Sequence, residues 1–111
     1  MSNIKVFFLS FLISLATLSC YCEDSDQTLL VFTANWCKYC NIAKNDMKNN
    51  EQVLTELKRY ATIEIDYDKD KDFVQGHNIK SIPTFIIFKD GKEQKRMVGY
   101  RGENNLVNFL K

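Results

Sequence analysis

The chain has 111 residues, of which 15 are Lys or Arg and 14 are Asp or Glu, so its formal net charge is +1. A chain of this length predicts one domain. The near balance of charge argues against a nucleic acid as partner and gives no reason to expect an anionic membrane surface.

The first 22 residues have the three-part layout of a secretory signal peptide. Lys5 supplies a positive charge, Val6–Leu18 is apolar, and small residues follow. The apolar run is short for a helix that crosses a hydrocarbon core of about 30 Å. We therefore expect residues 1–22 to be removed and the protein to be exported. The sequence has no Asn-x-Ser/Thr acceptor and no ER-retention tail, which favours a bacterial periplasm or envelope over a secretory lumen.

The cleavage site is left open by the sequence. Leu18-Ser19-Cys20 resembles a bacterial lipoprotein signal, in which Cys20 would be lipidated and would anchor the protein to a membrane. Thr17 and Ser19 also fit a small-x-small cleavage ahead of Cys20 without lipidation, and cleavage after Cys22 is a further alternative. In each case residues 23–27 form a short polar tether, and residues 28–111 form the folded domain.

Apolar periodicity and turn residues predict alternating strands and helices along this domain. The expected elements are a strand at Thr28–Thr33, a helix at Cys37–Asn49, a second short helix or a continuation after a kink at Glu51–Tyr60, a strand at Ala61–Asp66, a brief helix at Asp70–Gly76, strands at Thr84–Lys89 and Lys92–Val98, and a helix at Glu103–Lys111.

The order of these elements predicts an α/β fold with three layers. Strand–helix–strand units imply parallel pairing, while Asp90-Gly91 is a strong signal for an antiparallel hairpin. We therefore expect a central mixed sheet of about four strands with helices on both faces. Asn49-Asn50 is expected to end the first helix through a left-handed cap. Phe73 and Val74 are both expected to point inward.

Two cysteines three positions apart, Cys37 and Cys40, stand at the start of the predicted first helix. Residues at this spacing lie about one helical turn apart, which is close enough for a disulfide. Unpaired N–H groups and the helix dipole favour a thiolate at Cys37. A thiolate attacks disulfides, and a second thiol within reach can resolve the mixed disulfide. The spacing predicts a redox-active pair, with a structural disulfide as the alternative in an exported domain.

The sequence resembles the thioredoxin superfamily through Trp36-Cys37-Lys38-Tyr39-Cys40, Ile82-Pro83-Thr84, Asp90-Gly91 and Gly99. Small exported thioredoxin-like proteins and the C-terminal domain of DsbD are the most similar in character. The resemblance implies a thioredoxin-like fold in which Cys37 attacks, Cys40 resolves and Pro83 faces the pair through a cis peptide bond. A trans proline at a strand start would otherwise be the usual expectation.

Three positions depart from the pattern of cytosolic thioredoxins. Val31 stands six positions before Cys37, where those proteins carry a buried acid, and Thr62 stands near the place of a lysine. The dipeptide between the cysteines is Lys38-Tyr39 in place of Gly-Pro. The family's first strand and helix are also expected to be missing or reduced.

Further candidate residues surround the cysteine pair. The Ile82 backbone is expected to pair with an extended substrate segment beside Pro83, and Trp36 to form an apolar wall, with ordinary core as its alternative. Lys38 and Tyr39 are candidates for tuning the pKa of Cys37. Lys38 would act by its positive charge, with a solvated lysine as the alternative. Tyr39 carries no such charge, and packing against or covering the sulfur is its alternative role.

A base or a metal site is not expected. His77, the single histidine, is expected at the surface. Cys20 and Cys22 together with Cys37 and Cys40 would give the ligand count of a zinc site. Because Cys20 and Cys22 stand at or within the predicted signal, no metal is expected.

These features predict an exported thiol–disulfide oxidoreductase that needs no cofactor and contributes to cell redox homeostasis. Its partners would be protein disulfides and a redox protein that recycles the cysteine pair, and a monomer is expected. The residues leave the direction of electron flow open, while the resemblance favours reduction. A non-catalytic peptide-binding module with a structural Cys37–Cys40 disulfide is the alternative.

Overall fold

The computed structural model describes residues 27–111. The predicted signal peptide, Cys20 and Cys22, and residues 23–26 of the tether lie outside the described residues. The elements are β1 (Gln27–Thr33), α1 (Lys38–Asn49), α2 (Glu51–Leu57), β2 (Ala61–Asp66), α3 (Lys71–Gly76), β3 (Thr84–Lys89), β4 (Lys92–Val98) and α4 (Glu103–Leu110).

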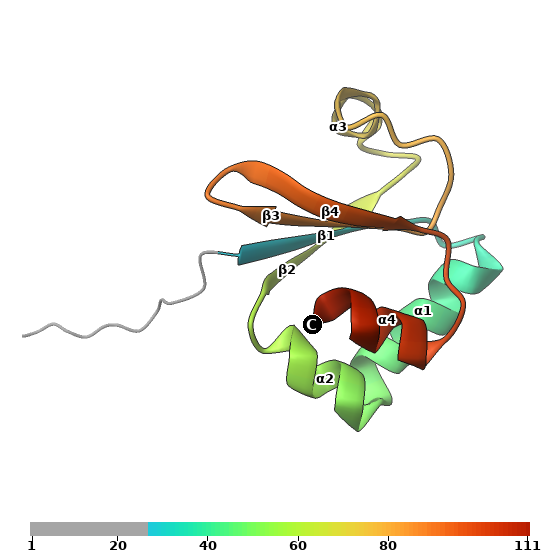
Figure 1. Cartoon of the computed structure of the whole chain (residues 1–111). Helices are drawn as coiled ribbons and strands as arrows, with labels where there is room; N and C mark the ends of the chain where they lie inside the picture. Colours follow the sequence, from blue (N-terminus) through green and yellow to red (C-terminus); the bar gives the residue numbers. More distant parts are fainter. Residues whose placement is uncertain (1–26) are drawn as a thin grey trace, which may run out of the picture.

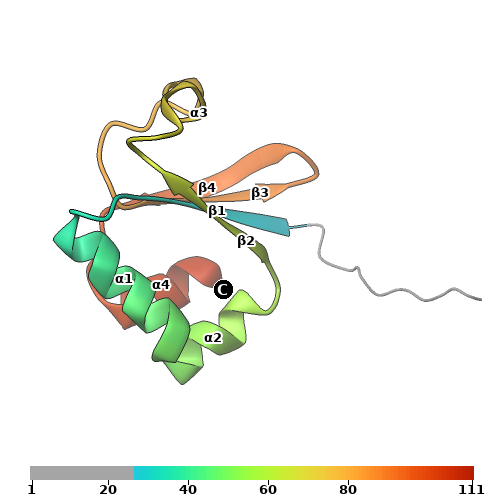
Figure 2. The ribbon, with the colours of Figure 1, turned by 180° about the vertical axis from the view of Figure 1, so that it is seen from behind.

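The four strands form one mixed sheet in the order β2-β1-β3-β4. β1 pairs with β2 in the parallel sense. The pairs β1–β3 and β3–β4 are antiparallel. The helices α1, α2 and α4 cover one face, and α3 alone lies over the other (Figures 1 and 2). This arrangement confirms the three-layer α/β fold expected from the sequence.

The continuously apolar strands β1 and β3 lie in the middle of the sheet, where both faces are covered. Leu29 and Val31 of β1 face the three-helix side, while Leu30 and Phe32 face the side of α3. Successive side chains of a strand point to opposite faces, so one strand contributes to both halves of the core. The core on the three-helix side also contains Ala43, Val53, Phe85, Ile87, Tyr100, Leu106, Val107 and Leu110.

The junction between α1 and α2 differs from its prediction. Asn50 has an extended backbone with φ −85° and ψ 122°, so it is not a left-handed cap. Its side-chain oxygen accepts a hydrogen bond from the Val53 N–H at 3.1 Å, which makes Asn50 the N-cap of a separate helix. α2 then ends at Leu57, before the predicted Tyr60.

The prediction that Phe73 and Val74 both point inward was wrong for Phe73. Val74 is 5% exposed, but the Phe73 side chain is 43% exposed. Adjacent helical residues project about 100° apart, and no second helix packs beside α3 in the described part of the chain. Phe73 therefore covers the outer side of Phe32, with ring centroids 6.1 Å apart.

The hairpin between β3 and β4 forms as the sequence indicated. Asp90 and Gly91 have φ values of 54° and 77°, the left-handed pair that a two-residue hairpin turn requires. Across residues 27–111, no helix combines the length and the apolar character needed to span a bilayer.

Candidate functional site

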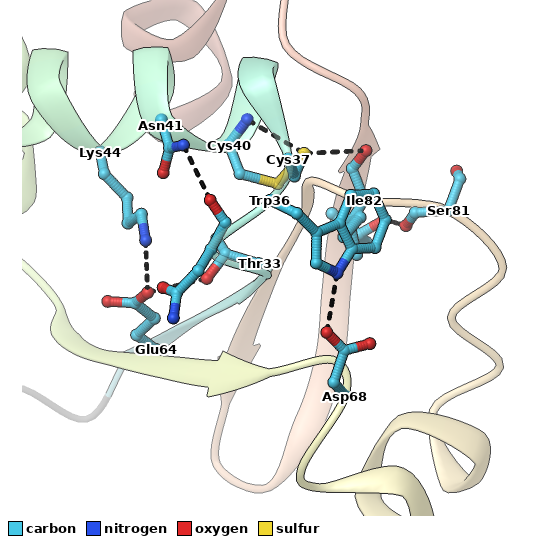
Figure 3. The surroundings of a disulfide bond; sticks show 12 residues. Thr33, Trp36, Cys37, Cys40, Asn41, Lys44, Glu64, Asp68, Ser81 and Ile82 are labelled. Carbon is cyan, nitrogen blue, oxygen red and sulfur yellow. Dashed lines mark hydrogen bonds and ion pairs between the residues drawn. A yellow bond between two sulfur atoms is a disulfide. The ribbon is translucent and has the colours of Figure 1, made fainter.

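The two cysteines lie where β1 leads into α1, at the edge of the sheet that also receives the loop before β3 (Figure 3). They form a disulfide with a Cα–Cα distance of 5.2 Å. Cys37 is the N-cap residue of α1. Cys40 is completely buried, whereas 7% of Cys37 remains exposed. The pair is thus asymmetric, and Cys37 is the member that solvent can reach.

The surroundings of Cys37 suit a sulfur that carries negative charge. Its Sγ accepts a hydrogen bond from the Cys40 backbone N–H at 3.2 Å, and the N-terminus of α1 supplies the positive end of a helix dipole. The same Sγ lies 3.9 Å from the Ile82 carbonyl oxygen. A reduced Cys37 thiol can therefore donate to Ile82, while its thiolate can accept from Cys40.

Pro83 lies beside this pair, and the Ile82–Pro83 peptide bond is cis, as the resemblance implied. The Gly99 N–H donates to the Pro83 carbonyl at 2.7 Å. Gly99 has a φ of 89°, which glycine adopts readily. This bond ties the end of β4 to the loop before β3 and fixes the backbone that faces Cys37.

Trp36 is not part of the core, because 68% of its side chain is exposed. Its Nε1 donates a hydrogen bond to Asp68 Oδ2 at 2.7 Å (Figure 3). Asp68 belongs to the charged turn after β2, and nothing in its sequence spacing indicated a contact with the cysteine motif. The bond fixes the exposed indole next to the cysteine motif, and the role of Trp36 as an apolar wall stays a prediction.

Lys38 and Tyr39 project from the first turn of α1. Tyr39 is 56% exposed, and the Lys38 ammonium lies 5.9 Å from the centroid of its ring. Within residues 27–111, no hydrogen bond links either side chain to a cysteine sulfur. Their predicted influence on the pKa of Cys37 stays a prediction.

The sequence did not reveal a polar cluster formed by Thr33, Lys44 and Glu64. The Glu64 carboxylate accepts from Thr33 Oγ1 at 2.7 Å and from Lys44 Nζ at 3.2 Å (Figure 3). Glu64 is the register partner of Val31. The carboxylate therefore stands on the strand next to Val31, at a cavity of about 270 Å³ lined by Val31, Lys44, Met47, Lys48, Leu57, Thr62 and Glu64.

The Glu64 cluster predicts a pH-dependent part of the stability. The Thr33 hydroxyl, and then Lys44, hold the pKa of Glu64 below its ordinary value, although partial burial opposes this. A lowered folded-state pKa stabilises the fold above the unfolded-state pKa of about 4.3, and this contribution disappears as the pH falls through the folded value. Glu64→Gln should lower the free energy of unfolding at pH 7 by at most about 1 kcal/mol, because the carboxylate is half exposed.

Urea unfolding near pH 7 and near pH 3 measures this effect. The difference between Glu64→Gln and the unchanged chain should shrink at the acidic pH. Thr33→Val should produce part of the same loss, and the double variant should cost less than the sum of the two single changes. Equal losses at both pH values would show that the carboxylate charge plays no part.

Comparison with known proteins places this geometry in a family. The family model for thioredoxin matches residues 16–111. The thioredoxin of Chlamydia trachomatis is 31% identical over 86 residues, which cover 78% of this chain and 81% of that protein. The thioredoxin of Mycoplasmoides gallisepticum is 30% identical over 89 residues, which cover 80% of this chain and 86% of that protein.

Solved structures agree with the sequence comparison. Thioredoxin from Trypanosoma brucei brucei superposes with a TM-score of 0.63 at 25% identity, covering 78% of this chain and 71% of that one. A paired Cys37 and Cys40 at a helix N-terminus, opposite a cis Ile82–Pro83 bond, is an arrangement in which disulfide exchange can proceed. The chain belongs to the thioredoxin family and is a thiol–disulfide oxidoreductase.

Proposed function

We propose that the protein is an exported reductant of protein disulfides that works in a bacterial envelope. The proposed direction, from the Cys37–Cys40 dithiol to a substrate disulfide, rests on the small number of hydrogen-bond donors around the Cys37 sulfur. Its Sγ accepts one hydrogen bond, from the Cys40 N–H, and within residues 27–111 no cationic side chain contacts it. Thiol–disulfide oxidoreductases that are strong oxidants have a strongly stabilised reduced form. The Cys40 N–H and the helix N-terminus stabilise the Cys37 thiolate less than further donors or a nearby cation would, so the disulfide stays favoured and the dithiol is a good electron donor.

The reaction starts from the Cys37–Cys40 dithiol. The Cys37 thiolate attacks one sulfur of the substrate disulfide, so that a mixed disulfide forms and the other substrate sulfur leaves as a thiolate, which takes up a proton. The Cys40 thiolate, after loss of its proton to solvent, then attacks Cys37 Sγ and releases the second substrate thiol. Two electrons have passed to the substrate, and a partner dithiol must reduce the Cys37–Cys40 bond again.

The surface beside Cys37 supports binding of an extended polypeptide. The Ile82 carbonyl oxygen lies 3.9 Å from the Cys37 sulfur, in the place where a backbone N–H next to a substrate cysteine would be received. Trp36 exposes 68% of its side chain. Trp36 and the Ile82 backbone thus form one side of the proposed substrate groove. The Pro83 side chain is fully buried, so its contribution is to the shape of the backbone and not to the contact surface.

Export is supported by the layout of residues 1–22. A resemblance to exported thioredoxin-like proteins and the C-terminal domain of DsbD, which we also propose, would fit a reducing role. Cys20 lipidation would hold the protein at a membrane, while cleavage after Cys22 would release it. Both forms would expose the same cysteine pair to envelope substrates.

The redox equilibrium of Cys37 and Cys40 with glutathione tests the proposal. We expect a reduction potential close to that of thioredoxin, which is about −270 mV. The full chain is produced in a bacterial host and recovered from the envelope, and mass spectrometry identifies its N-terminus. A variant with Cys20→Ser and Cys22→Ser ensures that only the Cys37–Cys40 pair is titrated.

Two results would contradict separate parts of the proposal. A potential near about −120 mV would make the protein a disulfide donor. Recovery of the unprocessed chain from the cytosol alone would contradict export and leave the direction of electron flow unaffected.

A further inference from the structure

β2 is an edge strand of the sheet. It pairs with β1 alone, and no described strand pairs with its outer side. Residues 61–64 are all exposed, and Ile63 exposes 48% of its side chain. An edge of this kind presents unpaired N–H and C=O groups to any strand that can approach it.

The opposite edge of the sheet is protected, whereas β2 is not. β4 carries Lys92, Glu93, Lys95 and Arg96, and its pairing with β3 shifts register at Ile87/Phe88. Charged side chains and such irregularities discourage pairing at an edge.

The β2 segment Ala61–Ile65 contains no proline and only one charged residue, Glu64. The Glu64 carboxylate is already bound by Lys44 and Thr33 on the helix-covered side. The middle of β2 therefore carries no uncompensated charge that would oppose pairing with another strand.

The register of β2 shows which of its groups point outward. The Tyr67 N–H donates to the Thr33 carbonyl of β1 at 2.8 Å. In a parallel pair alternate residues turn their backbone groups to the partner strand, so Ile65 and Ile63 bond to β1. Thr62 and Glu64 consequently present their N–H and C=O groups to the free side.

We propose that β2 pairs in the antiparallel sense with β2 of a second copy of this chain, with the two-fold axis at Ile63. In this register Thr62 faces Glu64 of the other copy and exchanges two hydrogen bonds with it. The two Ile63 residues face each other as a non-hydrogen-bonded pair, with Cα atoms about 4.5 Å apart, and their exposed apolar side chains become covered.

Charge complementarity favours the antiparallel sense. Lys58 and Arg59 precede β2, while Asp66 and Asp68 stand at its other end. Arg59 is already paired with Glu56, and Asp68 already accepts a hydrogen bond from Trp36, so Lys58 and Asp66 carry most of this argument. Antiparallel pairing brings the basic end of each copy to the acidic end of the other, twice in one dimer. Parallel pairing would bring like charges together, which is unfavourable.

The resulting dimer is closed and leaves both cysteine pairs accessible. An isologous edge contact uses the same strand on both subunits, so it ends with two copies and one continuous sheet. Each disulfide lies near the C-terminal ends of β1 and β2, and antiparallel strands place the two disulfides at opposite ends of the joined edge. A dimer differs from the monomer that the sequence alone predicts.

Sedimentation velocity over a range of protein concentrations tests the proposal. The mature protein, obtained from the full chain after export, should pass from monomer to dimer as its concentration rises. Ile63→Lys places two ammonium groups at the axis and should raise the dissociation constant at least about tenfold. Leu54→Lys is the matched control, because Leu54 is a comparably exposed apolar residue, at 38%, on α2. It should leave the dissociation constant unchanged.

Hydrogen exchange identifies the surface. The Thr62 and Glu64 amides should exchange quickly in the monomer and slowly at concentrations where the dimer forms. A monomer at every concentration, or a dimer that Ile63→Lys does not weaken, would overturn the proposal. Slow exchange of both amides in the monomer would also overturn it, because the chain's own N-terminal residues would then cover the edge.

Discussion

Replacing Cys37 by Ser is expected to reduce the rate of protein disulfide reduction at least about a thousandfold, because loss of a nucleophile removes the covalent step. Cys40→Ser should also stop turnover, but at a later point. Its Cys37 thiolate still attacks, and the mixed disulfide then persists because no second thiol resolves it. Reduction of insulin, followed with dithiothreitol as electron source, measures the loss. In a separate reaction of the reduced variants with insulin and without dithiothreitol, mass spectrometry should identify the covalent adduct in Cys40→Ser alone.

The fold should survive both substitutions. Serine is a favoured N-cap residue, so in Cys37→Ser the hydroxyl oxygen can replace the sulfur as acceptor of the hydrogen bond from the Cys40 N–H. The variant with Cys20→Ser and Cys22→Ser is the control, and it should keep full activity. Turnover by Cys37→Ser, or a trapped adduct on Cys37→Ser and none on Cys40→Ser, would reverse the roles proposed for the two cysteines.

The largest loss of stability is expected from Phe85→Ala in the central strand β3. Phe85 is completely buried in the core between the sheet and the three helices, and its ring centroid lies 6.2 Å from that of Tyr100. Truncation of a buried phenylalanine costs about 3–5 kcal/mol. The free energy of unfolding of a small domain is about 5–15 kcal/mol, so the variant should be close to unfolding at 37 °C. Urea titration followed by circular dichroism measures the change.

Phe73→Ala provides the comparison, since it removes the same group from a position that is 43% exposed. Its expected cost is about 1 kcal/mol, because nearly half of the side-chain area was already in contact with water. Equal costs for the two variants would mean that α3 packs more closely on Phe32 than the structure shows.

Local sequence determined the parts of this protein in which neighbouring residues decide the outcome. Asp90-Gly91 specifies its hairpin because both residues tolerate a positive φ. The apolar runs of β1 and β3 predict central strands because both faces of such strands must be buried. The spacing of Cys37 and Cys40 indicates a disulfide at a helix start because one helical turn brings the two side chains together.

The cis Ile82–Pro83 bond and its position opposite Cys37 belong to a different class. The local preference of an X–Pro bond favours the trans form, so the residues themselves would not have predicted the cis bond. The prediction came from the family resemblance.

Only the tertiary structure decided the contacts between residues that are distant in sequence. Trp36 meets Asp68, and Thr33 meets Glu64, because β1 and β2 lie side by side in the sheet. Phe73 is exposed because no second described helix packs beside α3, and β2 has a free edge because no described strand adjoins it. Periodicity reports which side of an element is apolar, but which neighbours cover that side depends on how the whole chain packs.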